Sequence, residues 1–344
     1  MKFYCFKHIP LYKISYIPLI QQDLLIFNPK LLKLVFSFQA IFCPEQNALL
    51  IYLILSFTIP VIIQKRPTEL SIQNKDVTLF TLFYPNPGKE TVILLHGGPS
   101  VPEGLSFIVH YLLSNYQVIT FHQRGTRRSP TASNNFSLES YIADINTLAN
   151  YFKLTLFHLF GHSWGGLYAQ VYAQEYASRL LSLFLCSPAS GTGSHWKDTV
   201  LEIADYNKRK CSYTEWVAMQ AQSALGLLGS DMAYKKFYGQ ALRNFSRGFK
   251  EVHPENFATD CIKAKAINQT VKAILKYPLL PEKIIPPYPL TIAYGARDIY
   301  GKSKKYVMRR YPTIPIIFIP ESGHIPWSHN TAVFVQILDE HYSK

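Results

Sequence analysis

Ser163, Asp298 and His324 are the residues whose types and sequence surroundings could do chemistry together. Ser163 is the centre of Gly161-His-Ser-Trp-Gly165, a Gly-x-Ser-x-Gly run between a predicted buried strand and a predicted helix. A serine hydroxyl is a poor nucleophile, and it needs a histidine to take its proton and a carboxylate to orient that histidine. Asp298 and His324 follow in that chain order, each after a predicted strand of its own. We therefore predict that these three residues form a nucleophilic triad.

A nucleophilic serine also needs hydrogen-bond donors for the negative charge that develops on the attacked oxygen. In this type of site, one donor is the backbone N–H of the residue after the nucleophile, here Trp164. The second comes from the loop after the first central strand, where His96-Gly97-Gly98-Pro99 places two glycines. We predict an oxyanion hole made by Gly98 and Trp164, with Gly97 beside the substrate.

Such residues meet only if a parallel sheet brings the carboxyl ends of its strands to one edge. Seven short apolar or β-branched runs predict strands, at residues 77–84, 91–96, 117–121, 154–160, 180–186, 290–294 and 314–319. The run 91–95 is apolar throughout, which is typical of a strand covered by helices on both faces. Helical patterns alternate with these runs, including 137–152 and 167–177. The alternation predicts an α/β fold with a mostly parallel, doubly covered sheet.

The strand pattern stops between residues 188 and 286. Four helices are predicted there instead, at 196–210, 212–228, 233–249 and 259–276. We predict that residues 188–286 form a helical cap, or lid, inserted into a core made of residues 68–187 and 287–344.

The predicted cap contains candidate substrate contacts. Glu202, Asp205 and Glu215 are carboxylates that could hold a substrate ammonium group. Trp196 and Trp216 could line an apolar pocket. The alternative for each of these residues is structural, as a charge on a solvated helix face or as an aromatic side chain of the core.

Five motifs together resemble the proline iminopeptidase family of α/β-hydrolases. They are His96-Gly-Gly-Pro99, Gln123-Arg-Gly125, Gly161-His-Ser-Trp-Gly-Gly166, Gly295-x-x-Asp298 and Gly323-His324. The resemblance covers about residues 70–344. It implies an α/β-hydrolase fold with an inserted helical cap, and a metal-independent enzyme without a cofactor that forms an acyl-enzyme. It also implies cleavage of an N-terminal residue, or of a related amide or ester, with Gly98 as the second oxyanion donor.

Three positions depart from the family's pattern. Ser100 stands where the family has the last glycine of His-Gly-Gly-Pro-Gly. His122 replaces the aspartate before Gln-Arg-Gly, and Arg127 replaces the second glycine after it. Because the predicted triad is intact, we expect an altered pocket in a working enzyme.

The 344 residues carry a formal net charge of +13, and 48% of them are apolar, which excludes a disordered polyelectrolyte. Residues 1–67 form an apolar N-terminal extension with seven basic and two acidic residues. Its longest apolar run, 48–63, would be about 24 Å long as a helix, shorter than the roughly 30 Å hydrocarbon core of a membrane. This run is either a membrane anchor of a cytoplasmic protein or part of an extension that packs on the enzyme.

Composition also limits the other partners. Five scattered cysteines indicate neither a disulfide framework nor a zinc site, so no metal site is predicted. Basic residues are spread over predicted helices without a recognised nucleic-acid-binding module, so we expect no nucleic-acid partner. The expected partner is a small-molecule or short peptide substrate, and the sequence does not predict an oligomeric state.

Three functions stay open at this point. The first is a proline iminopeptidase-like serine hydrolase of N-terminal Pro-like amides or small esters. The second is a carboxylesterase or lipase-like hydrolase of neutral or anionic esters, which the basic cap favours. The third is a catalytically silent hydrolase fold that serves as a binding protein.

Overall fold

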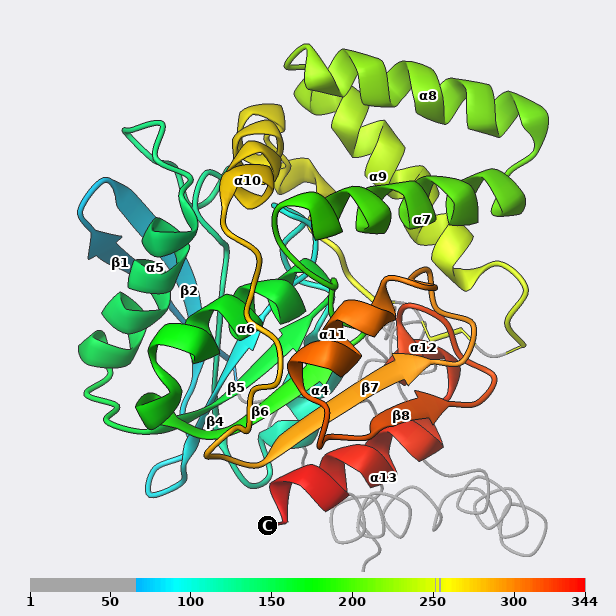
Figure 1. Ribbon diagram of the computed structural model, residues 1–344. Helices are drawn as coiled ribbons and strands as arrows, with labels where there is room; N and C mark the ends of the chain where they lie inside the picture. The colour runs from blue at the N-terminus through cyan, green and yellow to red at the C-terminus, as the bar shows by residue number, and fades with distance from the viewer. Residues whose placement is uncertain (1–65, 251, 254, 344) are drawn as a thin grey trace, which may run out of the picture. The chain divides into compact units, whose positions relative to one another are not determined.

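The computed structural model describes residues 66–250, 252–253 and 255–343, which build an eight-stranded sheet with helices around it (Figure 1). The strands follow the order β1-β2-β4-β3-β5-β6-β7-β8 across the sheet. The pairs β1–β2 and β2–β4 are antiparallel, and every other neighbouring pair is parallel. The strands are β1 (Thr68–Asn74), β2 (Val77–Tyr84), β3 (Thr91–Leu95), β4 (Gln117–Phe121), β5 (Phe157–His162), β6 (Leu180–Cys186), β7 (Leu290–Gly295) and β8 (Ile316–Ile319).

Seven of these strands lie where the apolar runs predict them, so the predicted α/β fold with a mostly parallel sheet is confirmed. The sequence pattern misses β1, an edge strand in which only Ile72 and Asn74 are buried. An edge strand with exposed polar side chains resembles a loop in sequence. β5 begins at Phe157 instead of Leu154, because Lys153 has a left-handed backbone (φ 56°) and the chain turns there before it enters the sheet.

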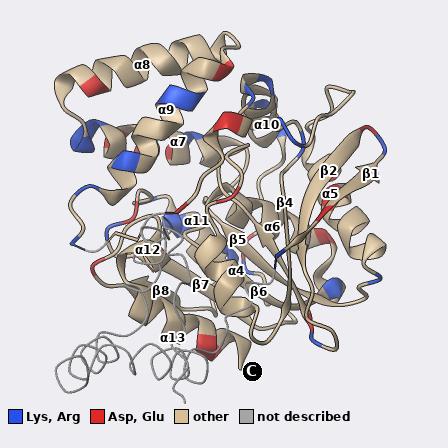
Figure 2. Ribbon diagram, turned by 180° about the vertical axis from the view of Figure 1, so that it is seen from behind, with Lys and Arg blue, Asp and Glu red and all other residues tan. Residues whose placement is uncertain are grey.

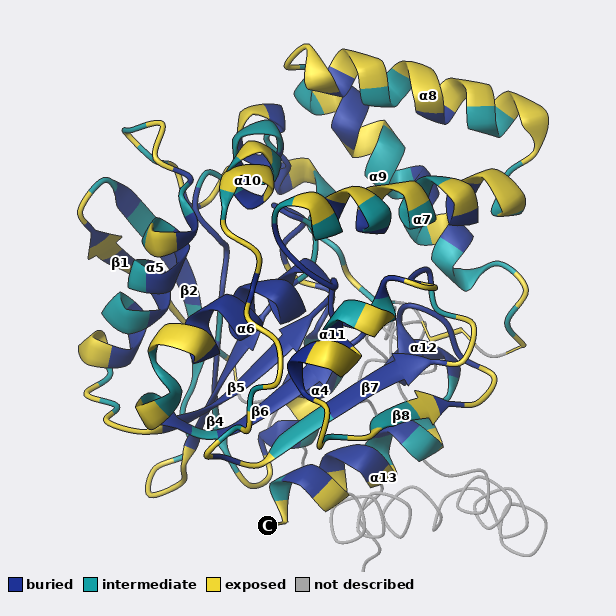
Figure 3. Cartoon of the chain, in the orientation of Figure 1, coloured by how far each residue is buried: buried dark blue, intermediate teal, exposed yellow. Residues whose placement is uncertain are grey.

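Alternate residues of the central strands face two separate apolar layers. In β3, Ile93 and Leu95 belong to the layer formed with α5 (Leu138–Tyr151), α6 (Trp164–Glu175) and α11 (Lys304–Arg310). Val92 and Leu94 belong to the layer formed with α4 (Ser106–Leu112), α12 (Pro326–His329) and α13 (Thr331–Tyr342). Helices therefore cover both faces, which is why the strand is apolar throughout. Figure 3 shows α6 and the central strands as the most buried elements.

Residues 188–286, called the helical insertion from here on, leave the sheet after β6 and return at β7. They contain α7 (Ser194–Lys210), α8 (Tyr213–Leu227), α9 (Asp231–Ser246), a short 3-10 helix η2 (Thr259–Cys261) and α10 (Ala264–Lys276). The four predicted helices are thus present, although α10 begins later than expected, after η2. In Figure 1, α7, α8 and α9 lie together at the top of the view, outside the layers that cover the sheet.

The predicted N-terminal extension, with its apolar run 48–63, lies outside the described residues except for Arg66 and Pro67. Within the part of the chain that is described, no helix combines the length and the hydropathy needed to cross a membrane.

Candidate active site

Ser163 occupies a sharp turn between β5 and α6. Its backbone has φ 56° and ψ −120°, a conformation that residues other than glycine rarely adopt. A side chain at Gly161 would collide with the backbone of Gly165, and one at Gly165 would collide with the carbonyl group of Leu95. The two glycines therefore let the turn fold tightly against the end of β3, and the strained turn presents the Ser163 hydroxyl beyond the sheet.

The structure brings the three predicted triad residues into one hydrogen-bonded row. Ser163 Oγ lies 2.9 Å from His324 Nε2, and His324 Nδ1 lies 3.1 Å from Asp298 Oδ1. Asp298 also accepts hydrogen bonds from the Ser187 hydroxyl at 2.5 Å and from the Tyr300 N–H at 3.0 Å. With its Nδ1 proton bound to the carboxylate, His324 has a bare Nε2 that can accept the serine proton.

The electrostatics of the row favour an ionised Asp298 beside neutral supporting histidines. Burial opposes ionisation, but the charge and hydrogen bond of His324 and the hydroxyl of Ser187 hold the pKa of Asp298 below its usual value. Burial and the neighbouring His324 lower the pKa of His162 to about 3, and its Nε2–H donates to the His324 carbonyl at 2.8 Å. Burial and the same neighbour lower the pKa of His329 to about 4. His324 thus lies between the Asp298 carboxylate and the uncharged His162 ring, whose centroid is 4.9 Å from its own.

The predicted oxyanion loop lies against the nucleophile. A Cβ atom on Gly97 would be 3.3 Å from Ser163 Cβ, so this loop passes directly beside the serine. Gly98 has φ 123°, which is the glycine-favouring region, and a side chain there would strike the backbone of Ser100 and Val101. The backbone N–H groups of Gly98 and Trp164 have no acceptor among the described residues, so both are free to bind an oxygen atom.

Gln123 links its own motif to the two motifs that contain His96 and Trp164. Its Nε2 donates to the His96 carbonyl at 2.9 Å, and its Oε1 accepts from the Trp164 indole at 2.8 Å. Its own backbone N–H donates to His96 Nε2 at 3.2 Å. The side chain therefore fixes the oxyanion loop to the first turn of α6.

The three departures from the family pattern have separate surroundings. Ser100 is buried with φ 62°, a conformation that explains why glycine suits this position. His122 is buried, contacts Phe80 edge to face, and lies 3.2 Å from Glu103 through Nε2. Arg127 is exposed and lies 3.9 Å from Asp260 of the helical insertion. Among the described residues, no hydrogen bond or ion pair joins these three positions to Ser163, Asp298 or His324.

The predicted carboxylate contacts, Glu202 and Glu215, are both occupied by protein donors. Glu202 accepts hydrogen bonds from the backbone of residues 301 and 303. Glu215 caps α8 through Ser212 and forms a two-point ion pair with Arg247 at 2.7 and 2.5 Å, which with the other hydrogen bonds lowers its pKa to about 2. Asp205 pairs with Arg209 one turn along α7. The alternative structural role therefore describes the contacts of these carboxylates better than the substrate contact predicted for them.

The two predicted tryptophans differ in their surroundings. Trp196 is 4% exposed and packs edge to face on Trp164, with ring centroids 6.4 Å apart. Its indole Nε1 is buried and has no hydrogen-bond partner among the described residues. Trp216 is partly exposed on α8, the most exposed helix of the helical insertion in Figure 3. Of the two, only Trp196 contacts a residue of the candidate site.

The sequence analysis did not predict two aromatic residues that lie at the site. Tyr300 places its hydroxyl 3.2 Å from Ser163 Oγ, and Phe245 of α9 contacts the His324 ring edge to face at 5.0 Å. The position of Tyr300 two residues after Asp298 is a signal that could have found it. Phe245 carries no local signal, because only the packing of α9 brings it to His324.

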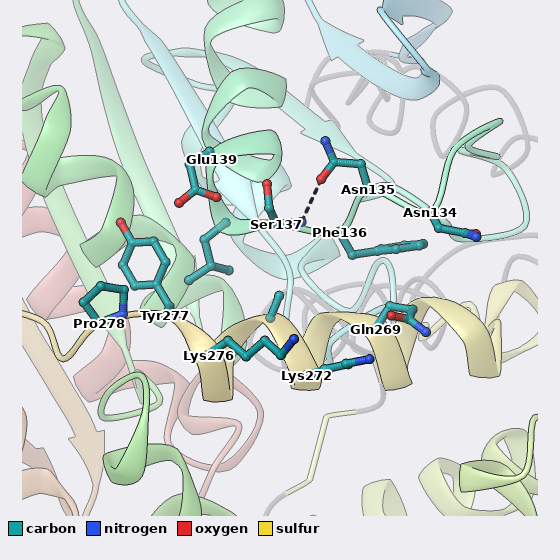
Figure 4. A pocket seen from close by; sticks show the side chains of 12 residues that line it. Asn134, Asn135, Phe136, Ser137, Glu139, Gln269, Lys272, Lys276, Tyr277 and Pro278 are labelled. Atoms are coloured by element: carbon teal, nitrogen blue, oxygen red, sulfur yellow. Dashed lines mark hydrogen bonds between the residues drawn. The ribbon is translucent and has the colours of Figure 1, made fainter.

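A separate cavity of about 450 Å³ lies between the start of α5 and α10 (Figure 4). It is lined by Asn134, Asn135, Ser137, Glu139, Gln269, Lys272, Lys276 and Tyr277, among others, and contains no predicted site residue. Within the described ranges, no group of three or more His, Cys, Asp or Glu side chains is placed to hold a metal ion.

Comparisons with known proteins concern the fold and the family of the chain. A family model described as alpha/beta hydrolase fold matches residues 90–301. The chain is 26% identical over 179 residues to a proline iminopeptidase of Clostridioides difficile (strain 630), which covers 51% of this chain and 58% of that protein. It is 24% identical over 123 residues to a proline iminopeptidase of Lactobacillus acidophilus (strain ATCC 700396 / NCK56 / N2 / NCFM), with coverages of 34% and 42%. The chain thus spans about half the length of these curated relatives.

Among solved structures, the carboxylesterase CesB from Bacillus subtilis aligns with a TM-score of 0.53 and 11% identity, over 80% of this chain and 91% of that one. At that identity the likeness concerns the fold alone.

Proposed function

The chain belongs to the α/β-hydrolase fold family, and on that premise we propose that it is a serine hydrolase with Ser163 as nucleophile, His324 as general base and Asp298 as orienting acid. The observation that carries this proposal is the row of hydrogen bonds from Ser163 through His324 to Asp298, at 2.9 and 3.1 Å. In this row, His324 can accept the proton of Ser163 through Nε2 while its Nδ1 proton is bound to Asp298.

The reaction then proceeds in two half-reactions. Ser163 Oγ attacks the carbonyl carbon of the substrate while its proton moves to His324 Nε2. The carbonyl oxygen becomes an oxyanion, which accepts hydrogen bonds from the N–H groups of Gly98 and Trp164. The tetrahedral intermediate collapses, the bond to the leaving group breaks, and the leaving group takes the proton from His324. Water repeats these steps on the acyl-enzyme ester, releasing an acid and restoring Ser163.

For the substrate we propose an uncharged ester or amide acyl group, with esters turned over in preference to N-terminal prolyl amides. An aminopeptidase needs a carboxylate for the substrate ammonium group. Every carboxylate that the structure describes in the helical insertion already has a donor of the protein within 4.0 Å; these are Asp198, Glu202, Asp205, Glu215, Asp231, Glu255, Asp260 and Glu282. Figure 2 shows the acidic residues of α7–α10 accompanied by basic ones.

The second candidate is a proline iminopeptidase. The His-Gly-Gly-Pro and Gln-Arg-Gly motifs and the named relatives favour it. For this candidate, one carboxylate must exchange its protein donor for the substrate ammonium group.

Turnover of prolyl-anilide and of p-nitrophenyl acetate and butyrate separates the candidates. We expect the esters to be hydrolysed with the higher kcat/KM, and Ser163→Ala to remove hydrolysis of every substrate. Efficient prolyl-anilide hydrolysis with little ester turnover would reverse the order of the two candidates. If wild type and Ser163→Ala act alike on all substrates, the hydrolase proposal is wrong and a binding role replaces it.

A further inference from the structure

A second hydroxyl group contacts the proposed nucleophile. Tyr300 Oη lies 3.2 Å from Ser163 Oγ, and the Tyr300 side chain is buried. The Tyr300 ring stands edge-on to the His324 ring, with centroids 5.1 Å apart and an interplanar angle of 88°. Its backbone N–H donates to Asp298 Oδ1 at 3.0 Å. One residue therefore contacts every member of the triad.

The proton positions in the triad decide which hydroxyl group donates. Asp298 accepts the Nδ1 proton of His324, so the bare Nε2 accepts the hydroxyl proton of Ser163. A serine hydroxyl has one proton, and that proton is already used. In the contact between Ser163 and Tyr300, the tyrosine is therefore the donor. Burial raises the pKa of Tyr300, so its hydroxyl keeps the proton at neutral pH.

The segment that follows Tyr300 is held by the helical insertion. Glu202, on α7, accepts hydrogen bonds from the Gly301 N–H at 2.8 Å, the Ser303 N–H at 2.9 Å and the Ser303 hydroxyl at 2.5 Å. Ser303 Oγ also lies 2.9 Å from Ser190 Oγ. Hydrogen bonds to an ionised carboxylate are about twice as strong as neutral ones. Glu202 thus fixes the chain directly after Tyr300, and does so from a different part of the fold.

We propose that Tyr300 is a catalytic residue of this hydrolase and that Glu202 is its positioning residue. Tyr300 donates to Ser163 Oγ and fixes the rotamer in which the serine presents its proton to His324. As that proton moves, negative charge grows on Oγ and the hydrogen bond from Tyr300 becomes charge-assisted. This inference rests on the proposed function, because it takes Ser163 as the nucleophile.

The rate at which a fluorophosphonate labels Ser163 tests the role of Tyr300 in the full-length protein. Tyr300→Phe keeps the ring against His324 and removes only the hydroxyl group. We expect labelling to slow by about tenfold, the effect of one hydrogen bond to a reacting atom. The thermal unfolding midpoint should not change. Labelling of Tyr300→Phe at the wild-type rate overturns the proposal, whereas labelling that persists in Ser163→Ala overturns the proposed function itself.

A double-mutant cycle tests the role of Glu202. We expect Glu202→Gln to slow labelling, and Tyr300→Phe combined with Glu202→Gln to be no slower than Tyr300→Phe alone. Asp198→Asn is the matched control, because Asp198 is also on α7 and also binds the core, through the Tyr306 hydroxyl at 2.5 Å. It should label at the wild-type rate. Additive effects of the two substitutions would show that Glu202 acts independently of Tyr300.

Discussion

At the scale of single residues, Asp298 sets the tautomer of His324. Asp298→Asn keeps the shape of the side chain but can present an N–H to His324 Nδ1. The His324 ring then carries its proton on Nε2, so Nε2 cannot accept the proton of Ser163. We expect kcat for ester hydrolysis to fall by about 10³- to 10⁴-fold, the loss seen when a triad loses its orienting carboxylate. Steady-state kinetics measure this, with Asp198→Asn as the control. A loss of less than about tenfold would mean that His324 does not depend on Asp298.

Single residues of the site differ in how well the local sequence predicts their contacts. Ser163, Asp298 and His324 are recognisable because each sits in a short motif at a strand end, and the structure places them together. The contacts of Glu202 and Glu215 are not predictable in this way. A carboxylate on a helix has the same local sequence whether it faces a substrate or a donor from a distant part of the chain. Here tertiary packing supplies donors 99 positions away for Glu202 and 32 positions away for Glu215.

At the scale of elements, a buried ion pair ties the loop after β4 to α5. Arg124 donates to both oxygens of Asp144 at 2.8 and 2.7 Å, and both side chains are almost fully buried. Removing one partner of such a pair leaves an uncompensated buried charge. We expect Asp144→Ala to lower the free energy of unfolding by about 3–5 kcal/mol in urea titrations.

The exposed pair of Arg128 and Glu69 provides the comparison, because it joins the same loop to β1 at the surface. Glu69→Ala should change the free energy of unfolding by about 0–1 kcal/mol. If Asp144→Ala and Glu69→Ala change the free energy of unfolding equally, the prediction that the buried pair of Arg124 and Asp144 contributes more to stability is wrong.

The sequence predicts well those strands and helices whose apolar residues follow a clear pattern over the whole length of the element. The central strands and α7–α10 are of this kind, whereas β1 exposes polar side chains at the sheet edge. The helices α4 and α11 have seven residues each, about two turns, which is too short for helical periodicity to emerge. Packing against the sheet determines these elements more than their own sequence does.

At the scale of the whole molecule, carboxylates of the helical insertion join it to the core. Glu202 binds the segment after Tyr300, and Glu255 accepts from Ser106 at 2.5 Å and from the Trp327 indole at 3.0 Å. The candidate site therefore lies where hydrogen bonds join the helical insertion to the core. The buried His96, His162 and His329 near the site are neutral in the folded protein, because burial lowers the pKa of each.

Because three buried histidines have lowered pKa values, we expect the folded protein to lose stability in mild acid. Burial lowers the pKa of His96 and His162 to about 3 and that of His329 to about 4, whereas an unfolded histidine titrates near pH 6.5. As the pH falls below 6.5, the unfolded chain binds protons that the folded protein does not, so the free energy of unfolding decreases with falling pH. From pH 6.5 to pH 5 we expect each histidine to lower the free energy of unfolding by about 1–2 kcal/mol.

Urea titrations across this pH range measure the summed effect of the three histidines. His329→Gln should reduce the slope of the free energy of unfolding against pH by up to about one proton. A slope that His329→Gln leaves unaltered would show that His329 binds its proton equally well in both states.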